Sequence, residues 1–439
     1  MQPRSHRSND ATALADEVRR RATPLRQAGD LDPLLERIGS ARVVMLGEAS
    51  HGTSEYYTWR ARITQRLVRE KGFSFVAVEG DWPDAYRVNR YVKGYDDVGA
   101  SAREVLHAFQ RWPTWMWANW EAVALAEWLR KHNDAQPGQR GVGFYGLDVY
   151  SLWESLAAIM RYLEETDPDA LEAARRAYAC FEPYGEDVQA YARGAAFVQA
   201  SCEDEVVDLL GDIRRHAQAT GDDDEAHFDA EQNARAAVGA ERYYRTMVRG
   251  GSQSWNVRDH HMIETLDDLL EHHGPEAKAI VWEHNTHIGD ARATDMAAAG
   301  MVNTGQLARE RYGDDAVVLV GFGSNRGSVI AGRSWGAPME RMEVPIAQAG
   351  SWEDVFHEAG VGDALLLTDR LSPAARGRRG HRAIGVVYDP TLERYGNYVS
   401  TDLPARYDAF VHCDVTRALH PLHVEPEEAG PPETYPWGV

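Results

Sequence analysis

A glutamate and a histidine lie three residues apart between two glycines, in segment 47–52. A histidine positioned by a carboxylate is the commonest general base near neutral pH, because its unperturbed pKa is about 6.5. Glycines let the backbone turn tightly and approach a ligand closely. The spacing therefore predicts a general-base pair, Glu48 and His51. The alternative is a glutamate that caps a helix beside a surface histidine.

Polar residues of the same kinds recur at three later points in the chain, each just after a short apolar run. They are Glu79 with Asp81, Asp148, and the group Glu283, His284 and His287. Arg60 and Arg258 could supply a cation near them, although a lone arginine more often forms a surface ion pair.

The apolar runs before these residues predict the strands that position them. The runs occupy 43–46, 73–78, 141–147, 277–282 and 315–321. Later runs of the same kind occupy 328–331, 364–367, 383–388 and 409–413. Their alternation with helical stretches favours an α/β fold with a mixed, mostly parallel β-sheet flanked by helices. Because parallel strands end at one edge of a sheet, the polar residues are expected to share one crevice there.

Residues 151–273 contain no convincing strand and show helical periodicity, which proline and glycine interrupt. An insertion of this size predicts a helical cap or lid on the sheet. We expect an α/β core from residues 1–150 and 274–439, with the helical insertion or cap over 151–273.

An aromatic segment at 112–120 contains four tryptophans. Such clusters usually pack in a core, but they also line apolar substrate clefts. The residues expected to contact a substrate are Asp81, Trp115, Trp117, Asp148 and Arg258.

The overall composition excludes several classes of partner. The 439 residues include 47 Lys and Arg against 68 Asp and Glu, a net charge of −21, which argues against binding to nucleic acid or an anionic membrane. The three cysteines have no paired spacing, so neither a disulfide framework nor a cysteine zinc site is expected, and a reducing compartment is the default. No signal peptide or membrane-length apolar run is apparent, which favours a cytoplasmic location.

Three motifs follow one another along the chain: Gly47-Glu48-x-x-His51-Gly52, Val78-Glu79-Gly80-Asp81 and Trp282-x-His284-Asn285-x-His287. With segments 327–331, 335–345, 350–351 and 384–388, they resemble the erythromycin esterase family over residues 40 to 420. The resemblance implies a hydrolase that opens an ester through an activated water, without a metal, a cofactor or a covalent serine. It implies His51 as general base and Glu48 as its partner, with Arg60, Glu79, His284 and His287 in the same site.

These features predict a hydrolase whose partner is a small-molecule ester, such as a macrolactone. Water deprotonated by His51 would attack the ester carbonyl, and His284, His287 or Arg60 would stabilise the oxyanion. The carboxylate of Glu48 would orient the imidazole.

A serine hydrolase and a metal-dependent hydrolase are two alternatives. Residues 332–336 satisfy the pattern G-x-S-x-G around Ser334, but two prolines at 338 and 345 leave no room for the long helix of a nucleophile elbow. The carboxylates and histidines, Glu283 included, offer mixed ligands suited to Zn, Mn or Fe, but their spacing is not a known zinc signature.

A third alternative is a protein that binds a small molecule in the same crevice without reacting with it. A histidine paired with a carboxylate is more than binding requires, so we favour the enzyme.

Overall fold

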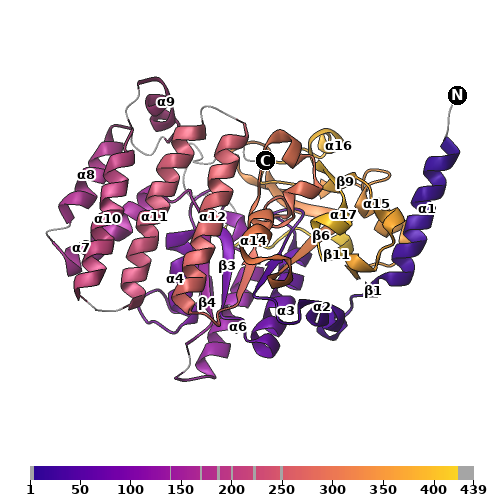
Figure 1. Ribbon diagram of the computed structural model, residues 1–439, viewed down its shortest axis with the longest axis horizontal. Coiled ribbons are helices and arrows are strands. Elements are labelled where there is room, and N and C mark those ends of the chain that lie inside the picture. Colours follow the sequence, from indigo (N-terminus) through magenta and orange to yellow (C-terminus); the bar gives the residue numbers. More distant parts are fainter. Residues whose placement is uncertain are drawn as a thin grey trace.

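The chain folds around one nine-stranded β-sheet (Figure 1). The computed structural model describes residues 4–138, 140–168, 171–184, 188–198, 201–220, 224–247 and 251–423. The strands run in the order β1, β8, β11, β6, β2, β5, β3, β4, and β7 pairs with β6. Their bounds are β1 Thr23–Pro24, β2 Val43–Leu46, β3 Phe75–Asp81, β4 Gly143–Asp148, β5 Ala279–Trp282, β6 Val317–Gly332, β7 Met339–Val344, β8 Ala364–Leu367 and β11 Ala409–Thr416.

The six neighbouring strands from β11 to β4 are parallel, whereas β1, β7 and β8 pair antiparallel with their neighbours. This arrangement confirms the predicted mixed, mostly parallel sheet. Val44 and Leu46 point to one face of the sheet, and Val43 and Met45 point to the other. Both faces are buried, which explains why the strands appear in the sequence as unbroken apolar runs.

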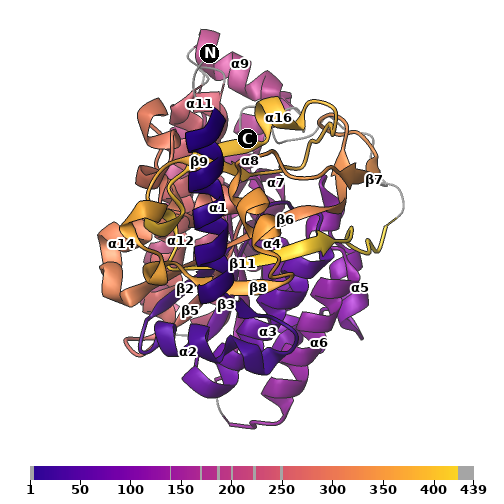
Figure 2. The ribbon, with the colours of Figure 1, turned by 90° about the vertical axis from the view of Figure 1, so that its right-hand side faces the viewer.

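Helices cover both faces of the sheet, as the view along its edge shows (Figure 2). One layer contains α2 (Asp32–Ile38), α3 (Ser54–Lys71), α5 (Ala102–His107) and α6 (Trp120–Asp134). The other contains α1 (Arg4–Arg21), α12 (Ser252–His273), α14 (Thr304–Tyr312) and α15 (Trp352–Ala359). Helix α4 (Trp82–Val92) packs on β4 and contributes to both cores.

A group of helices with its own apolar core lies at one end of the molecule, on the left in Figure 1. These helices are α7 (Leu152–Thr166), α8 (Leu171–Phe181), α9 (Val188–Val198), α10 (Glu203–Thr220) and α11 (Asp224–Met247). The described part of 152–273 contains no strand, as the sequence predicts. Helix α12 links this group to the sheet, because it packs on both α11 and β4.

Two of the later strand predictions differ from the structure. Runs 315–321 and 328–331 belong to one long strand, β6, which continues past the carboxyl end of β2. Run 383–388 is not a strand of the sheet. It follows β9 (Arg379–Arg382), which pairs with β10 (Tyr398–Thr401). It forms two isolated bridges, from Ile384 to Ser50 in the loop after β2 and from Val387 to Gly332 at the end of β6. Ala383, Ile384 and Tyr388 are buried and Val386 and Val387 are half-buried, so composition alone did not separate this run from a strand.

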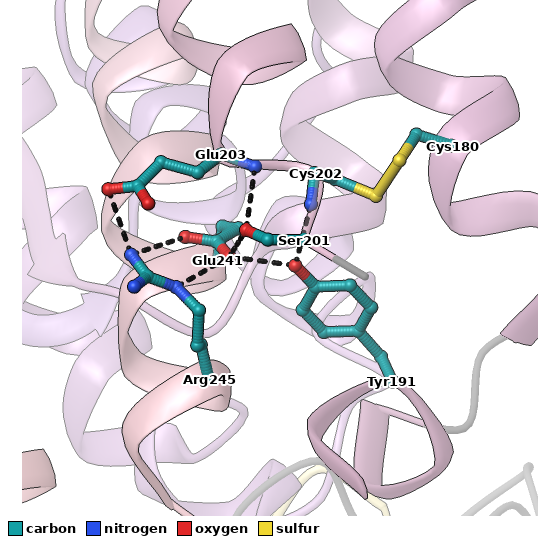
Figure 3. Close-up of a disulfide and its surroundings, with 7 residues drawn as sticks. All are labelled: Cys180, Tyr191, Ser201, Cys202, Glu203, Glu241 and Arg245. Atoms are coloured by element: carbon teal, nitrogen blue, oxygen red, sulfur yellow. Dashed lines mark hydrogen bonds and ion pairs between the residues drawn. A yellow bond between two sulfur atoms is a disulfide. The ribbon is translucent and has the colours of Figure 1, made fainter. Parts of the chain in front are cut away.

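A disulfide joins Cys180 and Cys202, although the sequence predicted no disulfide framework. The two cysteines are 22 residues apart, and only the folded helices bring them together. Figure 3 shows their surroundings, where Glu241 accepts hydrogen bonds from Tyr191 Oη (2.7 Å) and Arg245 Nε (2.9 Å). Because disulfides persist mainly in oxidising compartments, the cysteines do not support the cytoplasmic location, which stays a prediction.

Among the described residues, no helix has both the length and the apolar character that a bilayer span requires.

Candidate active site

The loop after β2 carries the predicted general-base pair. His51 Nδ1 lies 2.9 Å from Glu48 Oε1, and both side chains are buried. The two glycines that bracket the pair allow other backbone and side-chain atoms to approach closely. A Cβ on Gly47 would overlap the side chain of Asn285, and one on Gly52 would overlap the backbone of Ile330 in β6.

Arg60 lies behind Glu48, away from the cavity. Its Nη2 donates to Glu48 Oε2 at 2.5 Å, and its guanidinium packs over the rings of Tyr57 (4.4 Å) and Trp282 (4.5 Å). Glu48 therefore has Arg60 on one carboxylate oxygen and His51 on the other. An ionised glutamate only accepts hydrogen bonds, so Nδ1 of His51 carries the proton and Nε2 keeps its lone pair.

Arg258 of α12 joins the polar residues from the ends of β3 and β4. It donates to both oxygens of Asp148 (2.8 and 2.6 Å) and to Glu79 Oε1 (2.7 Å). Its Nη1 lies 3.1 Å from His287 Nε2, which must accept because a guanidinium has only donors. His287 Nδ1 then donates to Asp259, whose two oxygens lie 3.0 Å away.

His284 carries its ring proton on the other nitrogen from His51 and His287. The backbone N–H of Thr286 points to His284 Nδ1 (3.3 Å), and the Thr286 hydroxyl lies 2.8 Å from the same atom. Nδ1 therefore accepts, and Nε2 carries the proton. This Nε2 is buried and has no hydrogen-bond partner in the structure, and the ring centroid lies 4.9 Å from that of His51.

The two neighbouring histidines have pKa values shifted in opposite directions. Burial lowers the pKa of His51, but the carboxylates of Glu79 and Glu48 outweigh it, and the net pKa is raised. Burial, with the positive charge that His51 can carry, holds the pKa of His284 well below its usual range. Over the pH range in which His51 titrates, His284 is therefore a neutral N–H donor.

A cavity opens beside these histidines, with about 860 Å³ of empty space when the open solvent at its mouth is included. Of the predicted site residues it is lined by His51, Glu79, Asp81, Trp117, Asp148, Arg258, His284 and His287. Three others do not line it. Glu48 and Arg60 lie behind His51, and Trp115 packs edge-on against Trp112 in the apolar core.

Much of the remaining cavity lining is aromatic and apolar. It includes Phe109, Trp112, Pro113, Met116, Trp117, Tyr150, Trp335 and Val386. Sequence reasoning did not single out Asp259, Tyr150 or Trp335 as site residues. Asp259 directly follows Arg258 in the chain, and this adjacency was the one feature of the sequence that could have pointed to it.

Glu283 is fully buried, and no described residue forms a hydrogen bond with either of its carboxyl oxygens. Burial, together with the nearby carboxylates of Glu79 and Asp259, raises the pKa of Glu283 well above its usual range. We therefore expect this side chain to be a neutral acid in the folded protein. Among the described residues, no group of three or more His, Cys, Asp or Glu side chains is arranged to hold a metal ion.

Glu283→Gln is expected to gain stability over the native protein as pH rises. The native fold keeps the Glu283 proton, whereas the unfolded chain releases it above a pKa of about 4.3. Through this residue, the free energy of unfolding of the native protein therefore falls by up to about 1.4 kcal/mol per pH unit. Glutamine has no proton to lose. Urea unfolding at several pH values between about 5 and 8 measures the difference. Glu264→Gln, at an exposed position on α12, is the control. A stability difference that does not change with pH would show that Glu283 is ionised.

The chain is similar in sequence and in fold to known proteins. The sequence profile of the erythromycin esterase family matches residues 68–416, a range that begins after His51. The chain is 21% identical over 376 residues to erythromycin esterase type II of Escherichia coli, covering 77% of this chain and 83% of that one.

Solved structures share the fold over nearly the whole chain. One described as a succinoglycan biosynthesis protein has a TM-score of 0.75 at 22% identity, covering 95% of this chain and 100% of that chain. A mutant of the erythromycin esterase EreC in its open conformation has a TM-score of 0.67 at 17% identity, covering 92% and 99%. At these identities the likeness shows the fold alone.

Proposed function

Because this chain belongs to the erythromycin esterase family, whose members are ester-hydrolysing enzymes, we propose that it hydrolyses a carboxylic ester with water activated by His51. The observation that carries the proposal is the pairing of two neutral imidazoles with opposite ring protons at one end of the cavity. His51 offers a lone pair on Nε2, and His284 offers an unpartnered N–H.

The reaction then needs only these groups, water and the ester. His51 Nε2 takes a proton from water while the oxygen attacks the carbonyl carbon, whose C=O electron pair moves to the oxygen. The tetrahedral intermediate collapses with loss of the alkoxide, and the imidazolium returns its proton to that alkoxide. The products are a carboxylic acid and an alcohol. Glu48 holds the Nδ1 proton throughout and stabilises the imidazolium, and Arg60 holds Glu48.

His284 is the residue we assign to the developing oxyanion. Its Nε2–H has no hydrogen-bond partner among the described residues, whereas His287 Nε2 accepts from Arg258, and Arg60 is bound to Glu48. Donors aimed at a developing charge in a water-poor site are among the largest contributions to catalysis.

The aromatic lining of the cavity favours an ester with a large apolar part, such as a macrolactone. Trp112, Trp117 and Trp335 are among the residues that line it. We propose that residues 151–273 act as the cap, because α12 brings Arg258 to the cavity from that region.

A panel of esters that includes macrolides tests this function. We expect the native protein to convert at least one of them to a product heavier by one water, detected by mass spectrometry. We expect the rate to survive treatment with EDTA, and activity that returns only with one added metal would favour the metal-dependent alternative. Binding of a macrolide without conversion of any ester would favour the binding protein.

Ser334→Ala is expected to leave turnover within about twofold of native, since exposed substitutions away from a site have small effects. Ser334 lies in the exposed turn between β6 and β7, and a strand rather than a helix follows it. A nucleophile elbow needs that helix. Kinetics of the variant, together with labelling by a fluorophosphonate probe, measure the effect, and a stoichiometric adduct on Ser334 would support a serine hydrolase.

A further inference from the structure

Asn285 joins the two loops that carry His51 and His284. It is the first residue of α13 (Asn285–Ile288), directly after His284, and its backbone N–H donates to Glu48 O at 2.9 Å. Its side chain pairs with the backbone of Phe322 in β6, where Oδ1 accepts from the N–H (3.1 Å) and Nδ2 donates to the carbonyl (2.7 Å). These two bonds fix which end of the amide is the donor.

His381 contacts that donor from a segment nearly a hundred residues further along the chain. Its Nε2 lies 3.2 Å from Asn285 Nδ2. Since Nδ2 can only donate, Nε2 accepts, and Nδ1 carries the proton and donates to Glu353 Oε1 at 2.5 Å. The three side chains are 0 to 1% exposed, so no solvent competes for these bonds.

The charges around His381 favour this neutral form. Burial lowers the pKa of His381 and outweighs the charge and hydrogen bond of Glu353, which raise it. The guanidinium groups of Arg406 and Arg382 lower it further. Burial raises the pKa of Glu353, but His381 and Arg382 reverse that and bring it to about 2. A neutral histidine between an ionised carboxylate and an amide has only one way to orient its ring.

The segment after His381 also contacts the first catalytic loop. The backbone N–H of Ile384 donates to Ala49 O at 2.8 Å, and Gly385 and Val386 line the cavity. Segment 381–386 therefore contacts both loops, one through Asn285 and one through Ala49.

We infer that His381 is a positioning residue, which through Glu353 on one side and Asn285 on the other holds the loops of His51 and His284 in register. The inference rests on the function proposed for those two histidines. His381 does not line the cavity, so it acts through Asn285 and through the segment that bonds to Ala49.

Two substitutions at residue 381 separate positioning from packing. His381→Phe keeps a ring against Tyr407 and Phe410 but removes both hydrogen bonds. It is expected to lower kcat about 10- to 100-fold with KM within about threefold, because small displacements of catalytic groups have effects of this size. His381→Gln keeps an acceptor for Asn285 and is expected to recover most of the lost kcat.

His412→Phe is the matched control. His412 is a fully buried histidine of β11 that packs on Phe356, and its Nε2 lies 3.8 Å from Asp414. None of the contacts that the structure shows for it reaches the catalytic loops. We expect kcat to be native in this variant, and an equal loss in the two phenylalanine variants would overturn the inference.

A measurement without turnover keeps the test independent of the proposed function. In ¹⁵N-histidine-labelled protein, the His51 Nδ1 proton bonded to Glu48 should give a downfield resonance, identified by its absence in His51→Ala. It is expected to broaden or shift in His381→Phe and to persist in His381→Gln and His412→Phe. If no ester is hydrolysed, this result alone decides the inference. If His381→Phe does not fold, the ring nitrogens of His381 in the native spectrum decide the inference. A His381 that is charged, or protonated on Nε2, at neutral pH would overturn the inference.

Discussion

His51→Ala is expected to lower kcat/KM about 10²- to 10⁴-fold, the range that a positioned general base contributes. The variant should fold, because His51 belongs to none of the apolar clusters and Glu48 keeps its ion pair with Arg60. The measurement is steady-state kinetics on one hydrolysed ester, with circular dichroism and thermal unfolding as checks. His420→Ala is the control, since His420 also pairs with a carboxylate, Glu121 at 2.8 Å, but on the surface.

The pH dependence of the native enzyme identifies the same residue. Only neutral His51 accepts a proton, and its pKa is raised, so kcat/KM should fall as pH drops through a value above about 6.5 and level off above it. Glu48→Gln removes one of the carboxylates that raise this pKa, so the acid limb should move to lower pH. The maximum rate should also fall, because the ring loses the acceptor that fixes its tautomer.

Two results would contradict the assignment of His51 as the base. One is a folded His51→Ala protein with near-native kcat/KM. The other is an acid limb whose midpoint is the same in the native and Glu48→Gln enzymes. Either result would indicate that another group of the cavity accepts the proton.

The convergence of the polar residues was predictable because it follows from the sheet alone. Glu48, Glu79, Asp148 and His284 each lie at or just past the carboxyl end of a parallel strand, and neighbouring parallel strands end at one edge. The apolar composition of the strands was therefore enough to predict that these polar residues lie together, without any prediction of the loop conformations. The structure brings these residues together, and their chemical roles remain predictions.

The positions of the tryptophan side chains in the aromatic segment could not be predicted in this way. Trp115 and Trp117 are two residues apart and equally apolar, yet Trp117 lines the cavity while Trp115 packs against Trp112 in the core. The difference arises from a short 3-10 turn at Thr114–Met116, whose direction depends on its packing. Periodicity assigns a face only within a regular helix or strand.

Contacts between distant segments were equally hidden. His381 meets Asn285, and Cys180 meets Cys202, because of folded positions that no local pattern encodes. Arg60 follows His51 on α3, so its place near the site was expected, but its direction was not. The Arg60 guanidinium donates to Glu48, whose negative charge it neutralises. It is therefore not available to stabilise the oxyanion.

His284→Ala is expected to lower kcat about 10²- to 10³-fold with little change in KM, the cost of removing one oxyanion donor. The reason is geometric. No described residue forms a hydrogen bond with the Nε2–H of His284, so we expect its interaction to form when negative charge develops on the ester oxygen. His284→Gln places an amide N–H near the same point and should recover part of the rate. Thermal unfolding of both variants checks that the loop remains folded.

The pH profile of His284→Ala separates an oxyanion donor from a base. Because the pKa of His284 is far below its usual range, the acid limb belongs to His51 and should persist in the variant. A phosphonate that mimics the tetrahedral intermediate should lose affinity in proportion to the loss of kcat/KM across the native, Ala and Gln enzymes. Loss of the acid limb, or phosphonate affinity that stays native while kcat/KM falls, would assign the proton transfer to His284. In that case His284 would be the general base, and His51 would be the group that binds the oxyanion.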